Sequence, residues 1–138
     1  MAGYSGTPLP KKLGIGEGVR VAFPGEPASF RELLGKLPEG VEVRRRARGP
    51  LDVIVAFHTR RSELERSLDR LIANLDPDGG LWIAWPKRAS GVPTDITEDV
   101  VRDEGIARGL VDNKVCAIDE TWSGLRLVFR LSDRLARR

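Results

Sequence analysis

Residues able to carry chemistry stand at the ends of two apolar, strand-like runs. His58, the one histidine, directly follows the run 53–57, and Lys87 follows the run 81–85. An imidazole titrates near neutrality and can act as a general base. A strand-end histidine that is bonded to the backbone is the structural alternative. We therefore treat both residues as candidates for binding, without assigning a catalytic role.

A predicted turn between the last two strands holds three more candidates. Asp119 and Glu120 are adjacent, so on a strand their side chains point to opposite faces and cannot form a carboxylate pair for acid–base work. Either one could instead pair with an arginine. Trp122 offers a ring that could stack on a ligand or could simply pack the turn.

A metal site is not expected. Cys116 is the single cysteine, which excludes an internal disulfide and a multi-cysteine zinc site. It stands between Val115 and Ala117 in a predicted strand, where a buried and unreactive thiol is expected. One histidine and one cysteine far apart in the chain form no metal-ligand spacing.

Positive charge concentrates in one segment. The net charge is +3, while residues 44–61 hold six arginines and one acid, Asp52. Arginine is well suited to bind carboxylate or phosphate groups. The segment fits a solvated basic edge, an anion site that includes Arg44 and Arg45, or a nucleic-acid surface. Nucleic acid is disfavoured because no aromatic residues alternate with the arginines to stack bases.

Strand-like and helix-like segments alternate along the chain. We expect strands at 18–23, 41–44, 51–57, 81–85, 111–119 and 125–131, and helices at 27–37, 62–75 and 95–110. Capping boxes at Ser62 and Asp95 would open the last two helices. The alternation implies right-handed crossovers. The prediction is an α/β, Rossmann-like three-layer sandwich with a mainly parallel sheet of about six strands and an antiparallel C-terminal strand.

The length of 138 residues suits a single domain. Residues 1–17 are predicted to be an N-terminal arm with a helical turn at 10–13, residues 18–131 the α/β domain, and residues 132–138 a basic tail. No apolar run approaches the ~18 residues of a membrane span, and the first residues contain no signal-peptide core. We expect a cytoplasmic protein with no membrane partner.

The predicted topology places the candidates along one edge of the sheet. In open α/β sheets, ligands bind outside the carboxyl ends of the strands. The turn at 119–123 should lie on the same edge. The candidate ligand-binding residues are therefore Pro24, Gly25, Glu26, Arg44, Arg45, His58, Lys87, Asp119, Glu120 and Trp122.

The order of elements over roughly residues 18–130 resembles that of class I S-adenosylmethionine-dependent methyltransferases. The segment 76–83 resembles their turn and central strand, and residues 106–130 resemble their terminal antiparallel pair. The chain departs from that pattern at the cofactor site. Phe23-Pro24-Gly25-Glu26-Pro27 replaces the glycine-rich loop, Arg44-Arg45-Arg46 replaces the ribose-binding acid, and the sheet is one strand short.

A second resemblance extends over essentially the whole chain. The segments 3–9, 11–15, 85–87, 94–95, 114–120 and 122–126 resemble a bacterial family known only as a domain of unknown function. That resemblance implies a small intracellular protein and carries over no activity.

Three functions follow as hypotheses. The first is a non-catalytic, methyltransferase-like protein that binds a small anionic ligand or a protein partner at its basic edge, with no cofactor expected. The second is an active S-adenosylmethionine-dependent methyltransferase on a small substrate. The third is a weak nucleic-acid binder. The oligomeric state is not determined by the sequence.

Overall fold

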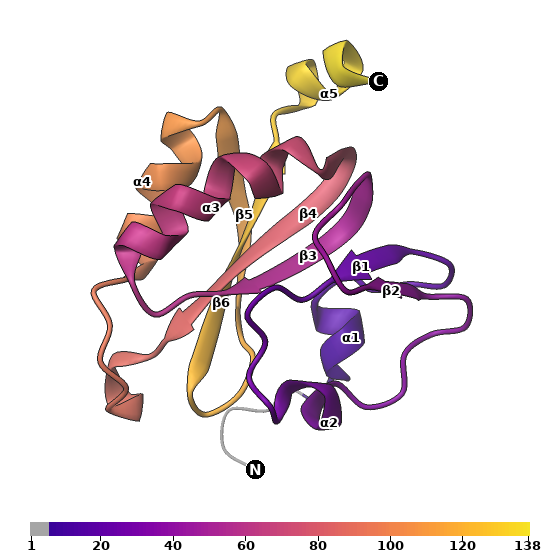
Figure 1. The fold of residues 1–138 in the computed structure, drawn as a ribbon. Coiled ribbons are helices and arrows are strands. Elements are labelled where there is room, and N and C mark those ends of the chain that lie inside the picture. Colours follow the sequence, from indigo (N-terminus) through magenta and orange to yellow (C-terminus); the bar gives the residue numbers. More distant parts are fainter. Residues whose placement is uncertain (1–5) are drawn as a thin grey trace.

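The computed structural model describes residues 6–138 as one six-stranded sheet with helices on both faces (Figure 1). The strands are β1 (Arg20–Ala22), β2 (Glu42–Arg44), β3 (Leu51–Phe57), β4 (Leu75–Pro86), β5 (Leu110–Ala117) and β6 (Trp122–Phe129). The helices are α1 (Leu9–Lys12), α2 (Phe30–Leu34), α3 (Arg61–Ala73), the 3-10 turn η1 (Arg88–Ser90), α4 (Glu98–Ala107) and α5 (Leu131–Arg137).

The sheet has the order β2-β1-β3-β4-β6-β5. The strands β2, β1, β3 and β4 are mutually parallel, whereas β6 runs antiparallel to both of its neighbours, β4 and β5. Alternation of strand and helix produces the parallel part, and the short 118–121 turn forces the antiparallel pair. The predicted α/β, Rossmann-like fold is confirmed.

Two apolar cores, one on each face of the sheet, hold the layers together. The helices α3 and α4 cover one face, with Leu64 and Leu68 fully buried against the strands. The segment around α1 and α2 covers the other face, where Leu13 and Ile15 are buried. The Trp82 indole Nε1 donates to the Leu13 carbonyl at 2.9 Å. Residues 9–15, expected to belong to an arm, therefore form part of this second layer.

The segment 76–80, expected to be a turn, lies within β4. Gly79 and Gly80 are buried, and β4 pairs with β3 from Leu51–Leu75 to Phe57–Ala84. A register shift after Leu51 absorbs the extra residues. A Cβ atom on Gly79 would come within 2.8 Å of the Asp52 carbonyl oxygen. The glycine thus serves close strand approach rather than a turn.

Helix caps also differ from the predicted capping boxes. Helix α3 has no side-chain cap of its own; the Asp95 carboxylate accepts a hydrogen bond from the Arg61 backbone N–H at 2.7 Å. Helix α4 is capped instead by Thr97, whose hydroxyl accepts from the Val100 N–H at 3.2 Å. Asp95 therefore caps the neighbouring helix in space.

The C-terminal part also differs from expectation. Strand β6 begins at Trp122, lies between β4 and β5 and is mostly buried, so the two edge strands of the sheet are β2 and β5. The predicted basic tail forms α5, and the Arg137 guanidinium lies 4.2 Å from the centroid of the Phe129 ring. Within residues 6–138, no helix combines the length and apolarity needed to cross a membrane.

Candidate functional site

The carboxyl ends of β1 and β3 are joined by a tight contact. The Phe57 N–H donates to the Pro24 carbonyl at 2.9 Å. Gly25 has a φ of +71°, and a Cβ atom built on it would lie 2.7 Å from the Phe57 carbonyl oxygen. Only glycine accommodates both the left-handed conformation and this approach. The loop after β1 is therefore held against the end of β3.

Four aromatic rings connect the elements at this edge. Phe23 and Phe30 have ring centroids 5.1 Å apart, Phe30 and Phe57 are 4.9 Å apart, and Phe57 and Trp122 are 5.1 Å apart, each pair edge to face. Such contacts orient the rings as well as burying them. Trp122 is thus held by Phe57 and remains half-buried at the edge.

Glu26 follows this turn at the end of β1. Its carboxylate lies 3.0 Å from Nε of Arg31, whose guanidinium lies 5.0 Å from the centroid of the Phe23 ring. The Glu26 side chain is 29% exposed, so the carboxylate can still accept a bond from a ligand.

Two arginines of the arginine-rich segment are paired with carboxylates. Arg44 pairs with the Glu42 carboxylate and donates to the Arg48 carbonyl at 2.8 Å. Arg61 pairs with Glu65 and with Glu104. Arg45 is exposed and forms no ion pair within residues 6–138.

His58 is turned away from this edge, toward α3. Its Nε2 lies 2.8 Å from Oγ of Ser67, and that hydroxyl donates to the Leu64 carbonyl at 3.3 Å. Nδ1 is buried and has no hydrogen-bond partner in the described part of the chain. Burial lowers the pKa of His58, and the carboxylate of Glu63 only partly opposes it.

Lys87 and Asp119 do come together, but to build a turn. One oxygen of the Asp119 carboxylate accepts from the N–H groups of Thr121 and Trp122 at 2.8 and 2.7 Å. The Lys87 ammonium donates to the Asp119 carbonyl at 2.7 Å. Glu120 points to solvent. Of the ten predicted site residues, His58 thus points away from this edge, and the Asp119 carboxylate already binds backbone N–H groups of its own turn.

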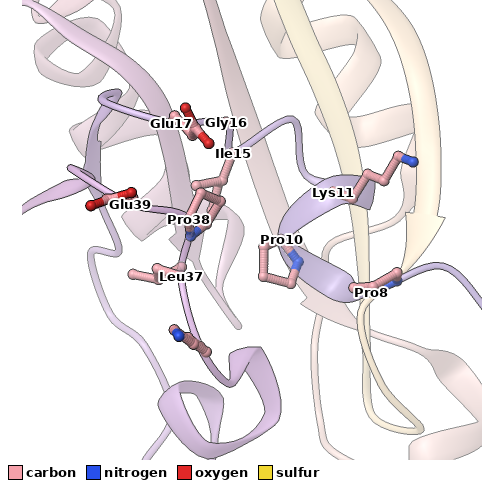
Figure 2. A pocket seen from close by; sticks show the side chains of 10 residues that line it. Pro8, Pro10, Lys11, Ile15, Gly16, Glu17, Leu37, Pro38 and Glu39 are labelled. Carbon is pink, nitrogen blue, oxygen red and sulfur yellow. The ribbon is translucent and has the colours of Figure 1, made fainter.

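Two pockets were not found by sequence reasoning. One of about 900 Å³ lies between α1 and the segment 36–39, with Pro10, Ile15 and Pro38 in its wall (Figure 2). The other, of about 410 Å³, lies beyond the carboxyl end of β4, between Trp85 and the start of α4. The first pocket joins two separate segments, 8–17 and 36–39, whereas the second is formed by the continuous segment 85–98.

The Cys116 thiol is half-buried on β5. Burial raises the pKa of this thiol, while the positive charges of Lys12, Lys114 and Lys87 lower it by less. The thiol is therefore protonated at neutral pH. This agrees with an unreactive cysteine, although the side chain is less buried than expected.

No protein-family model and no curated protein matches the chain, so its expected kinship with a bacterial family of unknown function has no support. Solved structures do match. They include magnesium protoporphyrin IX methyltransferase from Synechocystis PCC 6803 with bound SAH (12% identity, 83% of this chain, 75% of that chain, TM-score 0.56). A SAM-dependent methyltransferase from Aquifex aeolicus matches with 18% identity over 85% of both chains and a TM-score of 0.54. Fibrillarin from Aeropyrum pernix, with natively bound S-adenosyl-L-methionine, matches with 15% identity over 91% of this chain and 70% of that chain, at a TM-score of 0.54.

The fold is therefore that of class I S-adenosylmethionine-dependent methyltransferases. At these identities the likeness establishes the fold alone. It does overturn one prediction, the expectation that no cofactor is bound. The Synechocystis enzyme and the Aeropyrum fibrillarin share this fold and hold SAH or S-adenosyl-L-methionine in their structures. The replacement of the glycine-rich loop is therefore not a sufficient reason to expect that no cofactor binds.

Proposed function

We propose that this protein binds S-adenosylmethionine, or its demethylated product, at the carboxyl ends of β1 and β3. One observation carries the proposal. The strand order β2-β1-β3-β4-β6-β5, with its antiparallel end, is the architecture shared with structures that hold these ligands. Ligands of open α/β sheets bind at the carboxyl ends of the strands.

The residues at this edge fit a nucleoside ligand that carries a sulfonium. The Gly25 turn holds the loop after β1 against the end of β3 and so fixes the position of Glu26. The Glu26 carboxylate can accept hydrogen bonds from hydroxyl groups, as the acid of β2 does in the general pattern. The half-buried ring of Trp122, held by Phe57, offers an aromatic surface that attracts a cation.

Arg45, which follows β2, suits the anionic group of such a ligand. The guanidinium of Arg45 is exposed and free of ion pairs within the described residues, and a guanidinium can bind a carboxylate through two parallel N–H bonds. Arg44 is already neutralised by Glu42. Arg45 is therefore the residue that we assign to an anionic group of the ligand.

Binding without methyl transfer is the function that the side chains favour. S-adenosylmethionine, when bound, supplies an electrophilic methyl group. His58, the residue best suited to deprotonate an acceptor, is neutral, bonded to Ser67 and directed toward α3. The second hypothesis, an active enzyme on a small substrate, is decided by assaying transfer of a labelled methyl group.

The proposal is tested by thermal unfolding of the full chain with millimolar S-adenosylmethionine, its demethylated product, or adenosine. A ligand at a hundred times its dissociation constant adds about 2.7 kcal/mol, which raises Tm by about 10 °C in a domain of this size. The substitution Glu26→Gln should reduce the shift, whereas Glu32→Gln, on the exposed side of α2, should not. No shift with any of the three compounds overturns the proposal.

A further inference from the structure

A cluster of lysines lies beside α1, the end of β4 and the edge strand β5, away from β1 and β3. The chain has five lysines, and four of them surround Cys116. Lys11 and Lys12 come from α1, Lys87 follows β4, and Lys114 belongs to the edge strand β5. Segments about a hundred residues apart in the sequence thus bring like charges together, an arrangement that local sequence patterns do not reveal.

Three of these lysines line a pocket of about 450 Å³. Among residues 6–138, its wall consists of Lys11, Lys12, Lys114, Thr7 and residues 115–117 of β5, and none of these carries a carboxylate. A volume of this order is typical of sites for small molecules. Three ammonium groups and one hydroxyl are all hydrogen-bond donors, so the wall complements an anion with several acceptor oxygens.

These lysines form no ion pair with any residue in the described part of the chain. Every ion pair between the described residues, 6–138, has an arginine as its cation. Lys12 donates to the Ala117 carbonyl at 3.0 Å, and Lys87 donates to the Asp119 carbonyl. In Figure 2 the Lys11 side chain extends away from Glu17 and Glu39. Packing therefore holds several cations near one another.

We infer that this lysine pocket binds a small, multiply charged anion that carries phosphate groups. Like charges held close in space repel one another, and a bound polyanion removes that repulsion. A single-stranded nucleic acid is the poorer occupant, because no aromatic side chain of residues 6–138 lines the pocket to stack a base. The site is separate from the one proposed at β1 and β3, which does not require it.

Calorimetric titration of the full chain with inorganic pyrophosphate at low salt tests the inference. We expect saturable binding that weakens as salt is added. The double substitution Lys12→Gln, Lys114→Gln should weaken binding at least tenfold. Lys36→Gln is the matched control because Lys36 is the lysine outside the cluster, and it should change the affinity less than twofold.

Cys116 provides a second readout because it is the single thiol and lies in the pocket wall. With the uncharged reagent 4,4'-dithiodipyridine, the Cys116 thiolate attacks the disulfide, forms a mixed disulfide and releases one thiopyridone. Pyrophosphate should slow this reaction several-fold, with half of the effect at the calorimetric dissociation constant. Absence of binding, equal loss in Lys36→Gln, or binding of an oligonucleotide but not of pyrophosphate would each overturn the inference.

Discussion

A single side chain, His58, illustrates how burial decides chemistry at the residue scale. Sequence places it where a general base could stand. The structure directs its ring to Ser67 and leaves Nδ1 buried without a partner within residues 6–138. Burial lowers its pKa, because the charged imidazolium loses hydration. The residue therefore links the free energy of unfolding to pH.

The free energy of unfolding should depend on His58 between pH 7.5 and 5.5. The unfolded chain, with the higher histidine pKa, binds the proton first, so stability falls as the pH drops below about 6.5. The slope should approach at most about 1.4 kcal/mol per pH unit. Urea unfolding at several pH values measures it.

The variant His58→Gln should lose this slope, whereas Ser67→Ala should keep it while losing about 1 kcal/mol at every pH. An unchanged slope in His58→Gln would show that another group titrates in this range.

At the scale of elements, the connection from β1 to α2 is the most constrained turn of the candidate site. Its chain reverses at Gly25, and its carbonyl at Pro24 accepts from Phe57 in β3. The turn after η1 places fewer restrictions on the residue at its glycine position. Gly91, after η1, has a φ of +76°, but no atom lies within 4 Å of the position that a Cβ atom would occupy there. A comparison of the two glycines therefore distinguishes the cost of a positive φ from the cost of a close atomic contact.

The variant Gly25→Ala should lose more stability than Gly91→Ala. Both substitutions carry the cost of a left-handed conformation, about 1 kcal/mol. Gly25→Ala additionally drives a methyl group against the Phe57 carbonyl and should weaken S-adenosylmethionine binding as well. Urea unfolding and ligand titration compare the two, and equal losses of stability would refute the close contact.

At the scale of the molecule, the two cores depend on different parts of the chain. The core beneath α3 and α4 is built by consecutive strand and helix segments. The opposite core is completed by Leu13 and Ile15, which precede the first strand. The N-terminal segment therefore belongs to the folding unit. Without it, the ring of Trp82 would be exposed to solvent and its N–H would lose the Leu13 carbonyl as acceptor.

The variant Leu13→Ala should destabilise the whole protein by about 2–5 kcal/mol, since Leu13 is fully buried and its removal leaves a cavity. Leu135→Ala, at a position 73% exposed in α5, should change stability by less than about 0.5 kcal/mol. Chemical denaturation measures both, and a small loss for Leu13→Ala would mean that residues 9–15 dock loosely.

Sequence by itself determined the layered α/β fold. Apolar runs such as 51–57 and the helical spacing of Leu64, Leu68 and Leu71 are local patterns, and they dictate which segments form strands and helices. The order of those segments then restricts the topology to few choices. The cluster of candidates at one sheet edge followed from this topology, and Pro24, Gly25 and Trp122 do lie there.

Tertiary structure alone decided how individual side chains are used. The cap of α3 comes from Asp95, the ring of His58 turns to Ser67, and Lys12 and Lys114, more than a hundred residues apart, line one pocket. Each of these contacts joins segments whose proximity depends on packing of the whole sheet. The spacing of residues within a short stretch of sequence does not indicate such contacts, because they form only when folding brings distant elements together.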